Sequence, residues 1–493
     1  MFERLKKLIN KRREWKKSLM DKKQDFSYYA GSGIMQTAIR EWLDLYSGSM
    51  DEWRCGSTSS LKKRKSLNLP RRIACEISRL VCLEAEFNIL GDSDRACYLR
   101  EQLAPFMSRM RTAVEYAAAG GGMVFKPYAG ADGTIAIDTV QADRFCPIAY
   151  NSSGVMISAA FFETKVVNTA SENEKYLRVE KHLRDGNGYI ITNRAYRLER
   201  TSVSTGSGTG DCRIPNAPEI PLSSVPEWAA IEPEVVIENL DVPLFSYFKI
   251  PKGNTIDRGS PLGVSVYADV VNLIRDADTQ YDLLLWEYEG GAMALDVSQD
   301  AFDKDENGQA IIPEGRERLY RSNKFSVDDG TDTDLYKIFA PELRDSSYND
   351  GLETILRQIE NGCGLAYGTL SRADETVKTA TEIIKSKQRS YSTVTEIQKS
   401  LQGALEGLTA AMDALCDLYE LSPAGSYTTS ALWDDSIVND PETERIRDMQ
   451  EVREGLMAKW EYRVKWYGED ENTAKRAVGG DLSDEMLMRF GDA

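Results

Sequence analysis

Apolar residues recur at spacings of three and four in several stretches of the chain, the pattern of helices with one buried face. The clearest early case runs from Leu67 to Leu90, with Pro70 near its start, so we expect a helix there. The apolar positions of this stretch are Ile73, Ile77, Leu80, Leu83 and Phe87. Residues 1–60 also have a helical, amphipathic pattern, and another helix is expected from Cys97 to Ala119, interrupted by Pro105.

The period changes after residue 119. Residues 120–198 alternate apolar and polar side chains between turn signals such as "ADG" and "NSSG", which predicts strands and hairpins. The following stretch, "TSVSTGSGTGDCRIPNAPEIPLSS", is rich in Ser, Gly and Pro and predicts a long loop within residues 198–232.

A long helix is expected from Pro261 to Glu289, because Ser260 is a suitable cap and proline fits the first turn. Its apolar stripe consists of Val266, Val270, Ile274, Ala277, Tyr281, Leu284 and Tyr288. Gly290 and Gly291 would end it. Residues 292–342 then carry short strand-like pieces and acidic turns, which predicts a small separate domain.

Helical patterns dominate the remainder. One helix is expected at about 348–363, followed by the glycine-studded, flexible loop "GCGLAYGTLSRADE". The polar stretch from Thr376 to Ser400 merges into an apolar stripe that continues to Leu418, which predicts one long helix. "SPAGSYTTS" breaks the chain, and the tail is helical. The pattern as a whole predicts an α+β, predominantly helical fold of two to four domains.

The formal net charge of −17 changes the picture of possible partners, because such a surface repels nucleic acid on average. The charge is uneven: the first 23 residues hold ten Lys or Arg against three acids, and "KKRK" (Lys62 to Lys65) adds a second basic cluster. Either cluster is suited to phosphate contacts or to a solvated helix face. The basic N-terminus lacks the apolar core of a secretory signal, and no apolar run reaches the length of a membrane span, so we expect a cytoplasmic protein.

Candidate catalytic chemistry is sparse. The eight cysteines are scattered without a C-x-x-C pair, and the single histidine, His182, is expected on the surface of a strand or turn. No phosphate-binding loop is present, and neither glycine-rich stretch has the strand–turn–helix setting that phosphate binding requires. We therefore expect no enzyme activity and no cofactor.

One stretch matches a metal-binding pattern. "DKDENGQAIIPE" places Asp303, Asp305, Asn307 and Glu314 as in an EF-hand calcium loop. Ala310, Pro313 and the absence of flanking helical patterns favour a hairpin turn with surface acids instead. We expect no metal site here.

The segments taken in order resemble portal proteins of tailed bacteriophages, most closely the group from phages of Gram-positive hosts. The resemblance covers more than 350 residues and lies in the order and spacing of several stretches, none of them catalytic. These are "AIREWLDLYSGS", "LNLPRRIACEISRLVCLEAE", "GGGMVFKPY", "VQADRFCPIAYNSSG", "IPKGNTIDRGSPLGVSVYADVVNLIRDADTQYDLLLWEYEGG", "ELRDSSYNDGLETILRQIENGCGLAYGTLS", "TATEIIKSKQRSYSTVTEIQKSL" and "GLMAKWEYRVKWYGEDENTAKRAV". The extreme N-terminus and the loop at 198–232 match least.

The resemblance implies a ring, usually of twelve subunits, at one capsid vertex, through which terminase packages double-stranded DNA that later leaves by the same channel. Each subunit of the family has a wing, a stem, a clip and a crown. Laid over this sequence, the layout is a wing at 1–255, stem helices at 256–291 and 343–364, a clip at 292–342, a tunnel loop at 365–380, a long helix returning to the wing at 381–434 and a crown at 435–493.

The same resemblance implies roles for individual residues. Those expected to face DNA in the channel and tunnel loop are Thr369, Ser371, Arg372, Lys378, Lys385, Lys387 and Arg389. Those expected at the docking face of the clip are Asp303, Asp305, Glu306, Asp328 and Asp329. The implied partners are other copies of this chain, terminase, major capsid and scaffolding proteins, head-completion or adaptor proteins, and weakly held DNA read without sequence preference, with no membrane.

The resemblance places the protein in the virion, at the capsid vertex, after assembly in the host cytoplasm. Two other classes compete with this hypothesis. One is a minor capsid or head-morphogenesis protein that builds no channel, and the other is a nuclease. Two long helices on either side of a small domain favour the channel wall, and the single histidine argues against the nuclease.

Overall fold

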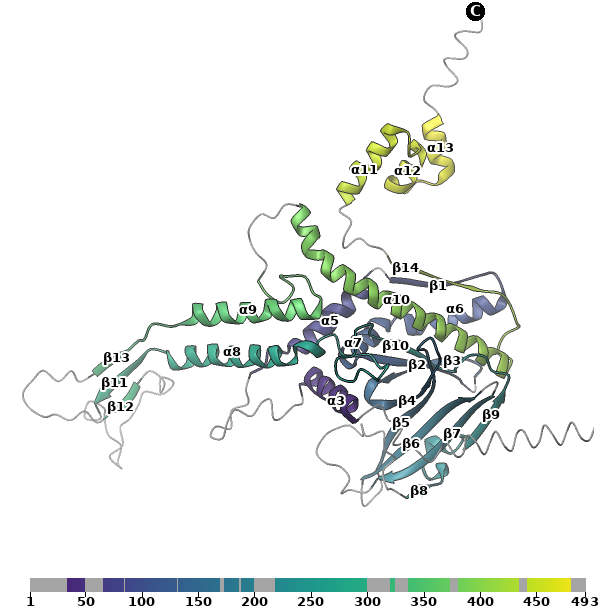
Figure 1. The fold of residues 1–493 in the computed structure, drawn as a ribbon, viewed down its shortest axis with the longest axis horizontal. Coiled ribbons are helices and arrows are strands. Elements are labelled where there is room, and N and C mark those ends of the chain that lie inside the picture. Colours follow the sequence, from purple (N-terminus) through teal and green to yellow (C-terminus); the bar gives the residue numbers. More distant parts are fainter. Residues whose placement is uncertain are drawn as a thin grey trace, which may run out of the picture.

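The fold is that of a computed structural model. It describes residues 33–48, 65–83, 85–130, 132–168, 173–185, 188–198, 218–298, 320–323, 336–372, 380–433 and 441–479. These residues form both helices and mostly antiparallel sheets, so the chain has the mixed α and β class that its pattern predicts (Figure 1).

The α-helices within these ranges vary from 9 to 40 residues. They are α3 (Gly33–Ser47), α5 (Leu69–Val81), α6 (Asp94–Met107), α7 (Met110–Gly120), α8 (Val271–Gly290), α9 (Asp345–Cys363), α10 (Ala380–Tyr419), α11 (Pro441–Glu454), α12 (Lys459–Tyr467) and α13 (Glu471–Gly479). The short 3-10 helices are η1 (Ala142–Arg144), η3 (Leu222–Ser224), η4 (Pro226–Trp228) and η5 (Ala268–Val270).

The strands within the same ranges form four sheets. The largest has the order β4-β5-β6-β7-β8, with β9 also paired to β7, and a second has the order β10-β2-β3. The others pair β1 with β14 and join β12-β11-β13. The strands are β1 (Ala85–Leu90), β2 (Gly122–Ala129), β3 (Ile135–Gln141), β4 (Phe145–Tyr150), β5 (Met156–Asn168), β6 (Asn173–Asp185), β7 (Gly188–Leu198), β8 (Glu219–Ile220), β9 (Glu234–Glu238), β10 (Ser246–Lys249), β11 (Ala294–Ser298), β12 (Tyr320–Asn323), β13 (Tyr336–Phe339) and β14 (Thr428–Trp433).

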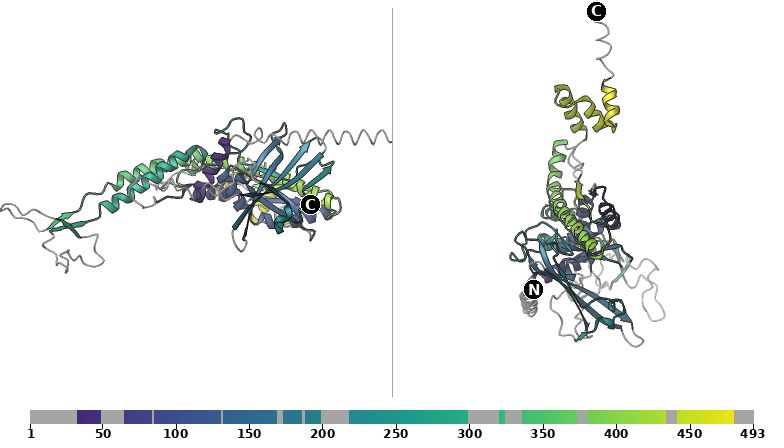
Figure 2. Two further views of the ribbon diagram at one scale, coloured as in Figure 1. Left: turned by 90° about the horizontal axis from the view of Figure 1, so that it is seen from below. Right: turned by 90° about the vertical axis from the view of Figure 1, so that its right-hand side faces the viewer.

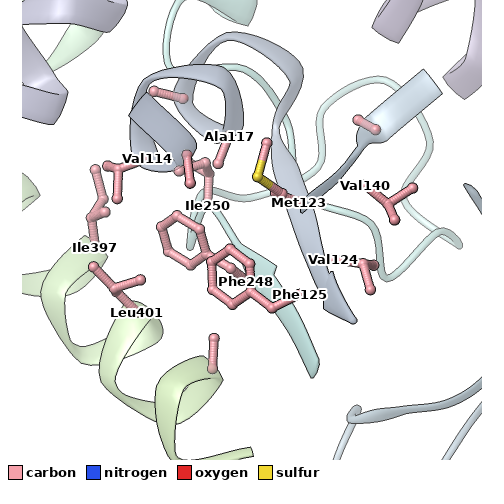
Figure 3. Packing of buried hydrophobic residues seen from close by; sticks show 14 of the residues in the cluster. Val114, Ala117, Met123, Val124, Phe125, Val140, Phe248, Ile250, Ile397 and Leu401 are labelled. Carbon is pink, nitrogen blue, oxygen red and sulfur yellow. The ribbon is translucent and has the colours of Figure 1, made fainter. Parts of the chain in front are cut away.

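The largest hydrophobic cluster of the body joins residues of α5, α7 and α10 to those of the sheet strands β2 and β10. Ile397 and Leu401 of α10 face the rings of Phe125 and Phe248 (Figure 3). The two rings stack with their centroids 6.1 Å apart, and neither side chain is exposed. The second half of α10 is therefore buried in the body, as its apolar stripe predicts.

Helices α8 and α9 lie side by side and project from the body (Figures 1 and 2). The chain leaves the body along α8, forms the three-stranded sheet β12-β11-β13 and returns along α9. We call α8 and α9 the stem hairpin and the three strands its tip sheet. The strand-like pieces predicted within residues 292–342 thus include β11, β12 and β13.

The described part of the tail forms the helices α11, α12 and α13, and α12 contacts both of the others. Asp448 of α11 accepts a hydrogen bond of 2.9 Å from the indole N–H of Trp466 and pairs with Lys465 at 2.7 Å. The predicted helical tail is confirmed over residues 441–479.

Two predicted helices differ from the observed elements. The one expected over Leu67–Leu90 ends at Val81, and Ala85–Leu90 is strand β1, which pairs with β14. The helix expected from Pro261 begins only at Val271, after η5. Residues 261–266 instead pass against α7, where the backbone N–H of Val266 donates to the carbonyl of Ala118 over 3.0 Å.

The helix expected from Cys97 to Ala119 is present as two helices. Pro105 lies inside α6 rather than at the interruption, which comes between Met107 and Met110. Proline has no backbone N–H and so cannot donate the hydrogen bond of an interior helical residue. The last turn of α6 is nevertheless helical at Pro105.

Candidate functional site

The stem hairpin is rooted in the body by polar contacts of α8. Asp278 is buried and accepts hydrogen bonds from the hydroxyl of Ser66 (2.7 Å) and the backbone N–H of Leu67 (2.9 Å). Arg275, one turn earlier, pairs with Glu41 of α3 at 2.6 Å. The first half of α8 is therefore fixed to two N-terminal segments as well as to α9.

Close approach of the two stem helices depends on a small residue near their root. A Cβ added to Gly362 of α9 would lie 2.3 Å from Cγ1 of Val270, which is too close for any larger residue without movement. Between the helices, Ile274, Ala277 and Ile359 are buried. This narrow apolar seam is what holds the hairpin as a pair of helices.

An ion pair closes the outer end of the hairpin. The backbone N–H and Nε of Arg344 donate to Oε1 of Glu287 over 3.2 and 3.1 Å, and its Nη2 donates to Oε2 over 2.8 Å. These bonds hold the pKa of the Glu287 carboxyl below its usual range. The pair ties the end of α8 to the start of α9 and so orients the tip sheet that lies beyond them.

Large apolar side chains remain exposed along the outer stem and the tip sheet. Each is between 41 and 63 % exposed, and they are Leu283, Trp286, Tyr288, Met293, Ile338 and Leu343. We call them the stem patch. Six large apolar side chains left exposed on one projecting hairpin are more than a solvated surface needs, so the hairpin is a candidate interaction surface.

The loop after α9 is held in one shape by a buried carboxylate. Glu360 is fully buried, and its Oε1 accepts the backbone N–H groups of Leu370 (2.6 Å) and Ser371 (2.8 Å). Its Oε2 accepts the hydroxyl of Ser371 over 2.8 Å. The sequence analysis described this loop as flexible, but residues 364–372 are fixed by Glu360.

A glycine lets the same loop pack on α10. Gly364 ends α9 with a φ of 72°, and an added Cβ would lie 2.2 Å from Oγ1 of Thr393. The loop is thereby attached to the stem through Glu360 and to the long helix through Gly364.

The residues predicted for the tunnel loop differ in their exposure to solvent. Thr369 and Arg372 are exposed, and the hydroxyl of Thr369 donates to the carbonyl of Ala366 over 2.6 Å. Ser371 is buried and bound to Glu360, so it shapes the loop and does not present its hydroxyl to a ligand. Its expected role as a residue facing DNA stays a prediction, and this contact does not support it.

Other predicted residues cannot be placed in the same way. Lys378 lies outside the described residues, and Lys385, Lys387 and Arg389 lie in the first turns of α10, where only the helix itself is described. The residues predicted for clip docking and for the EF-hand-like loop all lie outside the described residues: Asp303, Asp305, Glu306, Asn307, Glu314, Asp328 and Asp329.

The sequence analysis missed Glu360, although a signal for it was available. Leu356, Ile359 and Cys363 form the buried stripe of α9, and Glu360 adjoins that stripe. A carboxylate at the edge of an apolar stripe must find donors, because burying it unpaired would cost several kcal/mol. The donors come from a loop ten residues further along the chain, which the helical pattern alone does not indicate.

The single histidine, expected on the surface, is buried in β6. Leu244 donates its backbone N–H to the hydroxyl oxygen of Tyr189 (3.2 Å), which leaves the Tyr189 O–H to donate to Nδ1 of His182 (2.8 Å). The Nε2–H of His182 then donates to Oε1 of Glu180 over 2.7 Å. The histidine is therefore a neutral member of a closed network.

Charges around this network set its protonation. Burial alone would raise the pKa of Glu180, but Lys126, His182 and Arg178 outweigh it and hold that pKa far below the usual range. Burial lowers the pKa of His182, against the opposing effect of Glu180. Every polar atom of the imidazole is occupied, so the histidine is a structural residue of the sheet.

Within the described ranges, no group of three or more His, Cys, Asp or Glu side chains is arranged to hold a metal ion. Among the helices of those ranges, none combines the length and the apolar character that a bilayer span requires. No protein-family model and no curated protein matches this sequence.

Proposed function

We propose that this chain is the subunit of a ring-shaped portal, through which double-stranded DNA enters and leaves a phage capsid. The observation that carries the proposal is the stem hairpin: two helices projecting from a large body, with a small sheet at their far end (Figure 1). This is the arrangement that the stem and clip of a portal subunit would have. The order of the segments along the sequence supports the same proposal.

The surface of the hairpin supports assembly into a ring. Inside the pair, Ile274, Ala277 and Ile359 are buried, whereas the stem patch leaves six large apolar side chains open to solvent. A neighbouring copy offers the same hairpin, and cyclic symmetry repeats one contact around a closed ring without leaving an open edge. Packing between adjacent stems would cover the patch.

The loop between α9 and α10 is suited to passive contact with DNA. Its exposed Thr369 already donates its hydroxyl proton to Ala366, and the anchored backbone keeps the loop in place as DNA moves past. The occupied hydroxyl of Thr369 has no proton left for a phosphate, so contacts to phosphates would come from other exposed side chains of the loop and would position DNA without reading its bases. Arg372 is the one predicted cation on the described part of this loop, and it is exposed.

The acidic composition fits a channel whose wall does not bind DNA electrostatically. Twelve copies at −17 each would carry a formal charge of about −204 (12 × −17). Salt screens that charge within about 8 Å at physiological ionic strength, so repulsion acts only close to the wall. DNA would slide along such a wall more easily than along a basic one.

The remaining partners follow from the same proposal. The tip sheet would dock terminase during packaging and head-completion or adaptor proteins afterwards, α11–α13 would form the crown, and the body would contact major capsid and scaffolding proteins. The assembled ring would belong to the virion, at one vertex of the capsid.

Electron microscopy of the purified full-length chain in negative stain tests the proposal. We expect rings with a central hole, accompanied in light scattering by a mass many times that of one chain. A monomer at every concentration, with no rings, would contradict it. Duplex DNA bound tightly, with affinity falling steeply as salt rises, would contradict the low-friction channel while leaving the ring intact.

A further inference from the structure

A groove of about 820 Å³ opens on the body, away from the stem hairpin. Its walls come from β2, β3, β5, β6, β7 and β9, from the segment around Trp228, and from the end of α10. The resemblance assigned no role to this place, and it contains none of the residues predicted as sites.

The rim of the groove is apolar and exposed. Four of its lining residues are among the large hydrophobic side chains that the body leaves open: Tyr128 (52 %), Val235 (36 %), Leu418 (40 %) and Tyr419 (62 %). They come from β2, β9 and α10, three elements far apart in sequence, so the fold gathers them at one opening. An apolar rim of this kind favours an occupant with an apolar face.

The floor of the groove is charged but already paired. Glu180 lies 2.8 Å from Lys126 and 3.3 Å from Arg178, and Arg178 also lies 2.7 Å from Glu163. His182 donates to Glu180, as described above. The floor therefore offers little to a small charged ligand, and the occupant must be recognised at the rim and mouth.

The mouth of the groove is acidic. Besides the paired Glu163 and Glu180 of the floor, three carboxylates line the groove: Asp138, Glu227 and Glu232. Glu227 pairs with Lys165 outside the groove. Asp138 and Glu232 are exposed, and within the described ranges neither side chain has an ion pair or a hydrogen bond. These two carboxylates remain available to a basic partner.

We propose that this groove is the docking site of the chain's own basic N-terminal segment, residues 1–23. That segment carries ten Lys or Arg against three acids, which complements the acidic mouth. Its apolar residues Leu5, Leu8, Ile9, Trp15 and Leu19 are spaced to share one helical face, which complements the apolar rim. The segment thus has both properties that the groove requires of an occupant.

The length of chain before α3 limits how far the segment can reach. Residues 24–32 join the segment to α3, and nine extended residues span up to about 32 Å. Residues 1–23 as one helix add about 35 Å. Docking within one chain and docking onto a neighbouring chain are therefore two outcomes for the experiment to distinguish. The inference does not depend on the portal proposal, because it requires only the body and the N-terminal segment.

Zero-length carbodiimide cross-linking of the full-length chain tests the inference. This reagent joins a lysine to a carboxylate only when the two are in contact. We expect amide links from lysines of residues 1–23 to Asp138 and Glu232, read by mass spectrometry. The yield of the link between the exposed pair Lys165 and Glu227 is the internal reference for the efficiency of the reaction. Mixing ¹⁵N-labelled with unlabelled copies tells whether the segment docks within one chain or between chains, and either result supports docking.

A rim variant separates docking from chance proximity. Tyr128→Ser with Tyr419→Ser removes apolar rim but keeps both carboxylates, and we expect at least a fivefold drop in the links to Asp138 and Glu232. Leu432→Ser with Tyr467→Ser is the matched control, since these side chains are 60 and 58 % exposed outside the groove. That control should leave the links unchanged.

Salt gives an independent readout. Raising the salt concentration from 0.1 M to 1 M shortens the screening length from about 10 to about 3 Å. The yield of links from residues 1–23 to Asp138 and Glu232 should therefore decline relative to the Lys165–Glu227 link. The inference is overturned if residues 1–23 form no links, if they link mainly to carboxylates outside the groove, or if the rim variant and its control give equal yields. None of these outcomes bears on whether rings form.

Discussion

The body and the stem hairpin differ in how much of their large apolar side chains they leave exposed to solvent. Phe248 in the body is completely buried against Phe125 and α10, whereas Trp286 on the stem hairpin is 63 % exposed. The body buries most of its large apolar side chains against other residues of the same chain. The hairpin buries its inner seam but leaves large apolar side chains exposed on its outside. Under the proposed function, the body would carry the stability of the chain and the hairpin its assembly.

The largest expected effect lies in the body. Phe248→Ala should lower the free energy of unfolding by about 3–5 kcal/mol, because it removes a ring from a close-packed core and leaves a cavity. Urea denaturation followed by circular dichroism measures it. Phe248→Leu keeps most of the volume and should cost clearly less. Equal, small losses for both variants would show that the body is packed more loosely than its buried rings indicate.

A smaller effect is expected where the hairpin meets the loop. Glu360→Ala removes the acceptor of three hydrogen bonds and should lower the free energy of unfolding by about 2–3 kcal/mol. Hydrogen exchange at the Leu370 and Ser371 amides should accelerate as well. Glu353→Ala is the matched control, because Glu353 accepts one bond from the loop, the backbone N–H of Arg372. Unchanged exchange in Glu360→Ala would contradict the anchoring role.

Acid should weaken the body through His182. The pKa of His182 is lowered by burial, so below the ordinary value of 6.5 the unfolded chain takes up a proton that the folded chain does not. Stability should then fall by up to about 1.4 kcal/mol per pH unit as the pH drops below 6.5. Denaturation midpoints between pH 7.5 and 5.5 measure this dependence.

The chain has only one histidine, so the effect can be assigned. In His182→Gln the dependence between pH 6.5 and 5.5 should disappear, because the amide does not titrate. A wild-type chain with equal stability at pH 7.5 and 5.5 would show that His182 is protonated in the folded state.

The smallest effect on the single chain is expected on the stem patch. Trp286→Ser should change the free energy of unfolding by no more than about 0.5 kcal/mol, because the side chain is exposed. It should nevertheless reduce ring formation in sedimentation velocity experiments, whereas Leu432→Ser, also exposed, should not. A loss of stability without a loss of assembly would reverse the contrast between the two regions.

The long elements could be predicted because their patterns repeat many times. From residue 394 onward, α10 buries one helical stripe, formed by Val394, Ile397, Leu401, Leu405, Leu408, Met412 and Leu415. The alternating stretch after residue 119 gave β2 to β7 in the same way. Repetition over many residues makes the preferred period unambiguous.

The errors occurred where distant partners decide the structure. Phe87 continues the helical stripe of α5, yet it is buried in β1 because a strand more than 340 residues later pairs with it. Residues 261–266 have a helix-start signal but are held against α7 through Ala118. His182 has a polar side chain, yet Tyr189 and Glu180 satisfy it inside the sheet. None of these contacts is encoded by local sequence period.

The hydrogen bonds that Asp278 accepts from Ser66 and Leu67 attach α8 to the body near the middle of the helix. The outer half of α8 extends beyond this attachment. If the tip sheet is pushed sideways by whatever it holds, the segment that leads into α5 must tilt with it or these bonds must break. Mechanical load applied at the far end of the molecule would thus be passed into the buried core of the body, rather than being absorbed at a compliant joint.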